Sequence, residues 1–182
     1  LGIKTSSLPP MYQPNAQDQQ RLAQNVHFQR AFALRNLNAS SVWSNREWNW
    51  AVRDVISKKD DGMLLAAAQK ATQLGWYDRA IYAAERTSTK FNDQWRYPMP
   101  YQDLVVSYSQ KVGLDPAWTY GLIRQESRFA SVARSNVGAS GLMQIMPVTW
   151  AGLRLRHRLG ADPYDPHDNI IAGAGYIREL FD

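Results

Sequence analysis

Apolar residues recur at helical spacing along most of this 182-residue chain, and this period restricts its fold more than any other feature. No stretch alternates apolar and polar residues for long enough to predict a strand. We therefore predict an all-α protein. The predicted helices cover residues 18–37, 44–56, 60–74, 77–88, 102–111, 115–129 and 169–181.

The first predicted helix has Asp18 as its N-cap, and its apolar positions are Leu22, Val26, Ala33 and Leu37. Short loops join it to the three helices that follow. This arrangement predicts an α-superhelical solenoid or bundle.

The next helices have more regular faces. Trp48, Val52 and Val55 form one stripe of the second helix. Residues 63–88 are predicted to form a helical hairpin that turns at Gly75, with alanines on the facing sides. Small side chains there would allow two antiparallel helices to pack closely.

The stretch QWRYPMPY at 94–101 interrupts the helical pattern, because Pro98 and Pro100 cannot lie inside a helix. We predict a boundary here. Residues 1–97 would form the superhelical segment with its linker, and residues 98–182 a second helical domain.

Composition excludes several classes of function. The chain has no cysteine, so disulfides, zinc fingers and thiol catalysis are excluded. The net charge of +5 suits an anionic partner, including a polymer that carries carboxylates. Nucleic acid is not expected as a partner, because no recognition motif accompanies the charge. No apolar run approaches the ~20 residues of a membrane span.

Both ends of the sequence look cut, and we expect a piece of a longer protein. The chain starts at Leu1 without a signal-peptide pattern and stops at IRELFD, inside a predicted helix.

The candidate catalytic residue is Glu126, on a helix that starts at Asp115 and Pro116. With Trp118 at zero on a helical wheel, Leu122 falls near ~40° and Glu126 near ~80°. The wheel therefore places Glu126 in the apolar arc. Apolar surroundings and the negative end of the helix dipole both favour the protonated carboxyl that a general acid requires.

A simpler interpretation is that Glu126 lies at the edge of the arc and pairs with Arg124 or Arg128. The loop NVGASGLMQIMP that follows is rich in small residues, which allow a backbone to approach a bulky ligand such as a sugar chain. It is equally compatible with an ordinary turn in which Ser140 caps a short helix and Gln144 is exposed.

Together, ESRF and GASGLMQIMP resemble the soluble lytic murein transglycosylases. The resemblance implies a lysozyme-like catalytic domain after an α-superhelical region, and cleavage of the β-1,4 bond between N-acetylmuramic acid and N-acetylglucosamine. It implies that Glu126 acts first as acid and then as base, so that a 1,6-anhydro end forms. The substrate-binding residues that it implies are Ser127, Ser135, Gly141, Leu142, Met143, Gln144 and Met146.

The resemblance also implies a periplasmic, monomeric protein that acts on peptidoglycan glycan strands and uses no cofactor. The family's third block, Ala-Tyr-Asn-x-Gly, is absent, so we expect a truncated lysozyme-like domain. Three alternatives stay open: a lysozyme-type hydrolase with the same Glu, a non-catalytic peptidoglycan-binding helical module, and a nucleic-acid-binding helical repeat.

No metal site is expected. Asp162, Asp165 and Asp168 do not have the spacing of an EF-hand loop, and Asp before Pro is typical of turns, with Asp168 capping the next helix. His157 and His167 are isolated and expected to be solvated. The basic run at 154–158 could contact stem-peptide carboxylates or form a solvated helix face.

Overall fold

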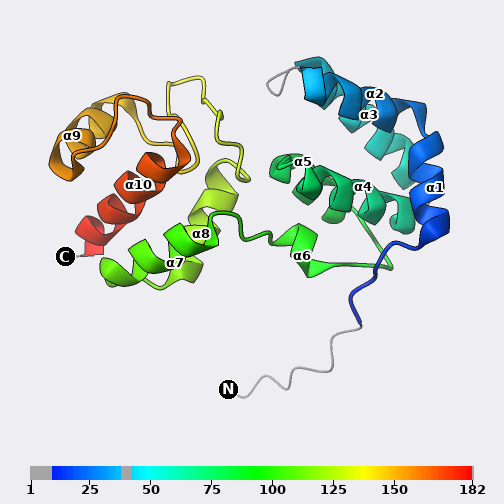
Figure 1. Cartoon of the computed structure of the whole chain (residues 1–182), viewed down its shortest axis with the longest axis horizontal. Helices are drawn as coiled ribbons and strands as arrows, with labels where there is room; N and C mark the ends of the chain where they lie inside the picture. The colour runs from blue at the N-terminus through cyan, green and yellow to red at the C-terminus, as the bar shows by residue number, and fades with distance from the viewer. Residues whose placement is uncertain (1–9, 38–41, 182) are drawn as a thin grey trace. The chain divides into compact units, whose positions relative to one another are not determined.

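The computed structural model describes residues 10–37 and 42–181, and every regular element within these two ranges is a helix (Figure 1). The prediction of an all-α protein is confirmed. The helices are α1 (Ala16–Gln24), α2 (Val26–Leu37), α3 (Val42–Ser57), α4 (Asp61–Gln73), α5 (Tyr77–Ala84), α6 (Asp93–Arg96), α7 (Gln102–Lys111), α8 (Pro116–Glu126), α9 (Pro147–His157) and α10 (Pro166–Phe181). None of the helices described is both long enough and apolar enough to cross a membrane.

The chain divides into two compact units, Leu1–Arg96 and Tyr97–Asp182, which are called unit 1 and unit 2 below. Helices α1–α6 belong to unit 1, and α7–α10 belong to unit 2. The sequence did not predict α6 or α9.

Unit 1 is built around Trp48, whose side chain is fully buried. Its ring lies 5.1 Å from Phe28 and 5.1 Å from Trp76, measured between ring centroids. The predicted stripe of α3 is confirmed, since Val52 and Val55 are also fully buried. The α4–α5 hairpin is confirmed as well. The alanines that it buries are Ala66, Ala67, Ala68, Ala71, Ala80, Ala83 and Ala84.

The single helix predicted over 18–37 is wrong, because the chain breaks at Asn25. Asn25 is extended, and its side-chain Oδ1 accepts hydrogen bonds from the backbone N–H groups of His27 and Phe28. It therefore caps a new helix, and the helical phase restarts there. As a result Val26 and Leu37 are exposed, whereas Phe28, Ala31 and Phe32 fill the core.

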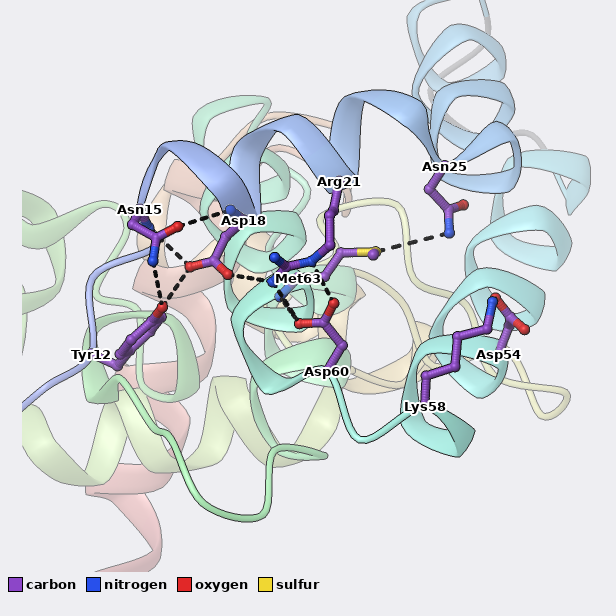
Figure 2. Close-up of polar contacts among 9 residues, drawn as sticks. All are labelled: Tyr12, Asn15, Asp18, Arg21, Asn25, Asp54, Lys58, Asp60 and Met63. Atoms are coloured by element: carbon purple, nitrogen blue, oxygen red, sulfur yellow. Dashed lines mark hydrogen bonds and ion pairs between the residues drawn. The ribbon is translucent and has the colours of Figure 1, made fainter.

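Asp18 is also not the N-cap of α1; that position belongs to Asn15, and the two form a capping box. The carboxylate of Asp18 is buried, accepts a hydrogen bond of 2.6 Å from the Tyr12 hydroxyl and pairs with Arg21 (Figure 2). Arg21 reaches on to Asp60 with two hydrogen bonds, of 2.7 and 3.0 Å. Asp60 caps α4, so this network joins the starts of two helices.

A second buried carboxylate, Asp61, holds the loop after α5. Its Oδ2 accepts from the backbone N–H groups of Ser88, Thr89 and Lys90 at 2.9, 2.6 and 3.1 Å. Burial would raise the pKa of Asp61, but these hydrogen bonds outweigh it, and the pKa lies below its ordinary value.

In unit 2, the start of α8 is as predicted, since the Asp115 side chain accepts from the backbone N–H of Ala117. Helix α10 presents buried small residues, including Gly173 and Gly175. A Cβ added at Gly173 would clash with the Met143 sulfur. The small residues of α10 thus allow the loop before α9 to pack directly on this helix.

We predict that Asp61→Asn lowers the free energy of unfolding by about 1–3 kcal/mol at pH 7, because a charged acceptor of three backbone N–H groups is lost. Folding lowers the pKa, so the carboxylate stabilises the protein above its ordinary pKa of about 4, and this contribution is lost as the pH falls through the folded-state value. Denaturant unfolding at pH 7 and pH 3 measures both effects.

The matched control is Asp54→Asn, which removes an exposed ion pair with Lys58 and should change stability by less than about 1 kcal/mol. Equal stability of wild type and Asp61→Asn at both pH values would contradict the assignment.

Candidate functional site

Glu126 is the last residue of α8, and its side chain is exposed. The predicted apolar setting is therefore wrong. Trp118 is 64% exposed, whereas Thr119 and Ile123 are fully buried, so the core covers the other edge of the wheel. Angular position shows which residues share a face, but it does not show which apolar residues meet the core.

Within the described residues, the carboxylate of Glu126 has no hydrogen bond and no ion pair, so the predicted alternative pairing with Arg124 or Arg128 is not formed. The Arg124 guanidinium instead lies over the Tyr97 ring, 4.8 Å from its centroid. Glu126 is thus a carboxyl group presented to solvent at the end of a helix.

The backbone turns sharply directly after Glu126. The Ser127 hydroxyl donates to the carbonyl of Ile123 and accepts from the backbone N–H of Phe129. Arg128 and Phe129 follow with φ values of +50° and +65°, in a region that non-glycine residues rarely adopt. Such strain costs about 1–3 kcal/mol a residue and persists where surrounding structure enforces it. Burial of Phe129 against Tyr120 supplies that enforcement.

The predicted site residue Ser135 closes a tight turn further along the loop. Its hydroxyl accepts from the backbone N–H of Ala139, and its own N–H donates to the Ala139 carbonyl at 2.9 Å. Ser127 and Ser135 therefore both use their hydroxyls inside the fold.

The Gly141–Gln144 block is a turn between paired residues, and the short helix considered as an alternative is not present. Ser140 and Ile145 exchange two backbone hydrogen bonds of 3.0 Å. Gln144 is not simply exposed, because its side-chain amide donates to the carbonyls of Ala133 and Gly141 at 3.0 and 2.8 Å.

The apolar residues of this block face inward. Leu142 is fully buried and Met143 is 5% exposed, whereas Met146 is 43% exposed. The structure therefore brings the predicted residues of 141–146 together in one turn. Leu142 and Met143 anchor this turn, and only Met146 presents a largely free side chain.

A residue that sequence reasoning missed, Asn169 of α10, holds this turn in place. Its side chain is fully buried, and its Oδ1 accepts from the Met143 N–H at 2.8 Å. Its Nδ2 donates to the carbonyls of Ser140 and Pro163 at 3.1 and 2.9 Å. Gly141 has φ +78°, and a Cβ there would clash with this amide. The available signal was weak: Asn169 is the first residue of the predicted helix and directly precedes its apolar residues.

Two cavities adjoin α8. The larger, about 410 Å³, is lined by Asp115, Ala117, Trp118, Gly121, Leu122 and Gln125. The smaller, about 280 Å³, lies beside Tyr97, Arg124 and Phe129. Glu126 lines neither of the two.

The acidic residues before α10 form turns, as predicted, but the cap is Asp165, whose Oδ1 accepts from the Asp168 N–H. Asp168 accepts instead from the Gly160 N–H, and the His167 ring hydrogen-bonds to it; these contacts lower the pKa of Asp168. Asp165, His167 and Asp168 lie close enough to share an ion, but their atoms are already occupied within the turn. His157 is half-buried rather than solvated, with its Nε2 buried against Gly175.

Comparison with known proteins finds a family match in the second half of the chain. A family model described as the transglycosylase SLT domain matches residues 103–182. The soluble lytic murein transglycosylase of Salmonella typhimurium is 28% identical over 148 residues, which is 79% of this chain and 22% of that protein. A transglycosylase of Enterobacteria phage PRD1 is 34% identical over 84 residues, 46% of this chain and 30% of that protein.

Two solved structures to which this chain is similar are also lytic transglycosylases. The lytic transglycosylase Slt of Pseudomonas aeruginosa, an inactive mutant, has a TM-score of 0.80 and 29% identity over 93% of this chain and 27% of its own. The 70-kDa soluble lytic transglycosylase of Escherichia coli has a TM-score of 0.74 and 25% identity over 94% of this chain and 28% of its own. The chain spans about a fifth of the curated relative from Salmonella, at 22% of its length.

We predict that Asn169→Ala lowers the free energy of unfolding by about 2–4 kcal/mol, because it leaves buried backbone groups of Ser140, Met143 and Pro163 without partners. The backbone amide of Met143 should also lose its protection from hydrogen exchange. Exchange measured by NMR or mass spectrometry follows this directly.

Asn136→Ala is the control, since Asn136 lies exposed in the same loop. A Met143 amide that stays protected in Asn169→Ala would show that the turn does not depend on Asn169.

Proposed function

We propose that this chain belongs with the soluble lytic murein transglycosylases and that Glu126 is its catalytic acid and base, since residues 103–182 match the transglycosylase SLT domain. The proposed substrate is the glycan strand of peptidoglycan, which the protein would cleave between N-acetylmuramic acid and N-acetylglucosamine. We place this activity in the bacterial cell envelope, and specifically in the periplasm, by a chain that acts as a monomer.

The observation that carries the proposal is the placement of Glu126. It lies at the last position of α8, exposed, with no competing hydrogen bond or ion pair among the described residues. The strained pair Arg128 and Phe129 turns the chain away directly behind it. A carboxyl group on a helix end that is fixed in this way can meet the oxygen of a bound glycan.

The proposed reaction needs a single carboxyl group. In the first step Glu126 donates its proton to the glycosidic oxygen, the C1–O bond breaks, and N-acetylglucosamine leaves as an alcohol. The substrate's own acetamide stabilises the positive charge at C1. In the second step the Glu126 carboxylate takes the proton of the C6 hydroxyl while O6 bonds to C1. No water is consumed, and Glu126 is protonated again.

A bound glycan would also create the setting that the exposed carboxyl lacks. A sugar chain seated over Glu126 excludes water, and exclusion of water favours the neutral carboxyl over the ion. Substrate binding thus prepares the acid.

The remaining predicted residues have a supporting part in this proposal. Ser127 fixes the backbone directly after Glu126, and Ser135 and Gln144 fix the loop that follows, through the hydrogen bonds described above. We propose that the Gly141–Gln144 turn offers its backbone to the glycan and that Met146 offers its exposed side chain. Glycine at 141 allows a sugar to approach this backbone closely.

We predict that Glu126→Gln in the full-length gene product lowers the release of muropeptides from purified sacculi by about 10²–10⁴-fold, the usual size of a general acid–base contribution. Mass spectrometry of the wild-type products should show ends lighter by one water than hydrolytic ends.

The control is Glu179→Gln, which removes another exposed carboxylate of unit 2 and only an exposed pair with Arg156. Hydrated reducing ends would indicate a hydrolase with the same acid. Full activity of Glu126→Gln, or no release by a folded wild type, would refute the assignment.

A further inference from the structure

Helix α3 carries an exposed row of aromatic and cationic side chains, which we call the Trp–Arg face: Trp43, Arg46, Trp50 and Arg53. The spacing of three, four and three residues keeps all of them within roughly 80° on the helix. Trp43 is 63% exposed and Trp50 is 56% exposed, whereas Trp48 of the same helix is fully buried. The core of unit 1 therefore uses the opposite side of α3.

The cations of this face are available to a ligand. The Arg46 guanidinium lies 5.0 Å from the Trp43 ring centroid, and that of Arg53 lies 5.4 Å from the Trp50 ring centroid. Within the described part of the chain, neither arginine pairs with a carboxylate.

The neighbouring acids have partners of their own. Glu47 pairs with His27 at 2.8 Å, and Asp54 pairs with Lys58 at 2.7 Å. Neither of these carboxylates therefore holds a guanidinium group of the Trp–Arg face.

The face is hollowed rather than flat. A cavity of about 670 Å³ lies between α2 and α3 and is lined by His27, Leu34, Trp43, Arg46, Glu47, Asn49, Trp50 and Arg53. A second cavity of about 300 Å³ adjoins Trp50, Arg53 and Asp54. This volume is in the range of small-ligand sites and fits several linked rings.

We propose that the Trp–Arg face binds an acidic carbohydrate strand, with sugar rings stacked on Trp43 and Trp50 and carboxylates held by Arg46 and Arg53. An indole offers a large flat apolar surface with little loss of side-chain entropy on binding, and a guanidinium matches a carboxylate with two hydrogen bonds. The inference rests on the proposed function, because peptidoglycan carries both sugar rings and carboxylates.

The test measures binding without cleavage. Full-length protein that carries Glu126→Gln is co-sedimented with purified sacculi, beside the same protein with Trp43→Ala and Trp50→Ala, or with Arg46→Gln and Arg53→Gln. We expect each pair of changes to weaken sacculus binding about tenfold or more, as loss of exposed aromatic and arginine anchors does. The arginine variant should also bind with less sensitivity to salt.

The control replaces Lys59 and Lys70 by Gln, which removes the same charge from exposed positions of unit 1 elsewhere. Because the four side chains of the face lie outside the core, thermal unfolding should stay unchanged. Wild-type affinity in the folded Trp variant, or no binding of sacculi at all, would overturn the inference. Muropeptide release is scored separately, with full-length protein that keeps Glu126. Sacculus binding that depends on the Trp–Arg face, without any cleavage by the protein that keeps Glu126, would refute the proposed function alone.

Discussion

The side-chain amide of Asn169 organises the candidate site. It satisfies three backbone groups on two segments at once, and it does so in full burial, where an unpaired amide costs the most. This contact sets the path of the Ser140–Met143 turn, and Gly141 is required because no Cβ fits beside the amide. Small residues on α10 complete the arrangement by leaving room for Met143. The shape of the Ser140–Met143 turn is thus set by contacts with α10, a helix that follows the turn in the chain.

The same principle explains why Glu126 has a defined position although its own side chain forms no hydrogen bond or ion pair among the described residues. Ser127 ties the helix end, and Arg128 and Phe129 hold an unfavourable backbone conformation that the buried Phe129 ring stabilises. The fold therefore tolerates backbone strain at Arg128 and Phe129, which fixes the position of Glu126, and among the described residues it places no hydrogen-bond or ion-pair partner on the carboxylate. An exposed carboxyl on a rigid support can bind a polymer from solvent and then be desolvated by it, whereas a buried carboxyl could not be reached.

Local signals made part of this structure predictable. Asp115 with Pro116, the turn at Gly75 and the Trp48 stripe depend on neighbours in sequence, and all three are confirmed. The break at Asn25 was missed because its capping bonds compete with a helical period that runs through it. The role of Asn169 depends on partners up to 29 residues away, and the exposure of Glu126 depends on which face of α8 the core covers. Neither is encoded in periodicity alone.

The two units differ in what they offer a glycan. In unit 2 the polar side chains of the predicted site are largely used by the fold, since Ser127, Ser135 and Gln144 bond to the backbone. What these positions offer a glycan is therefore mainly backbone groups and apolar contact. In unit 1 the Trp–Arg face leaves its cations without carboxylate partners among the described residues. Under the two proposals, a second contact on the same chain would raise the effective concentration of a glycan strand at Glu126.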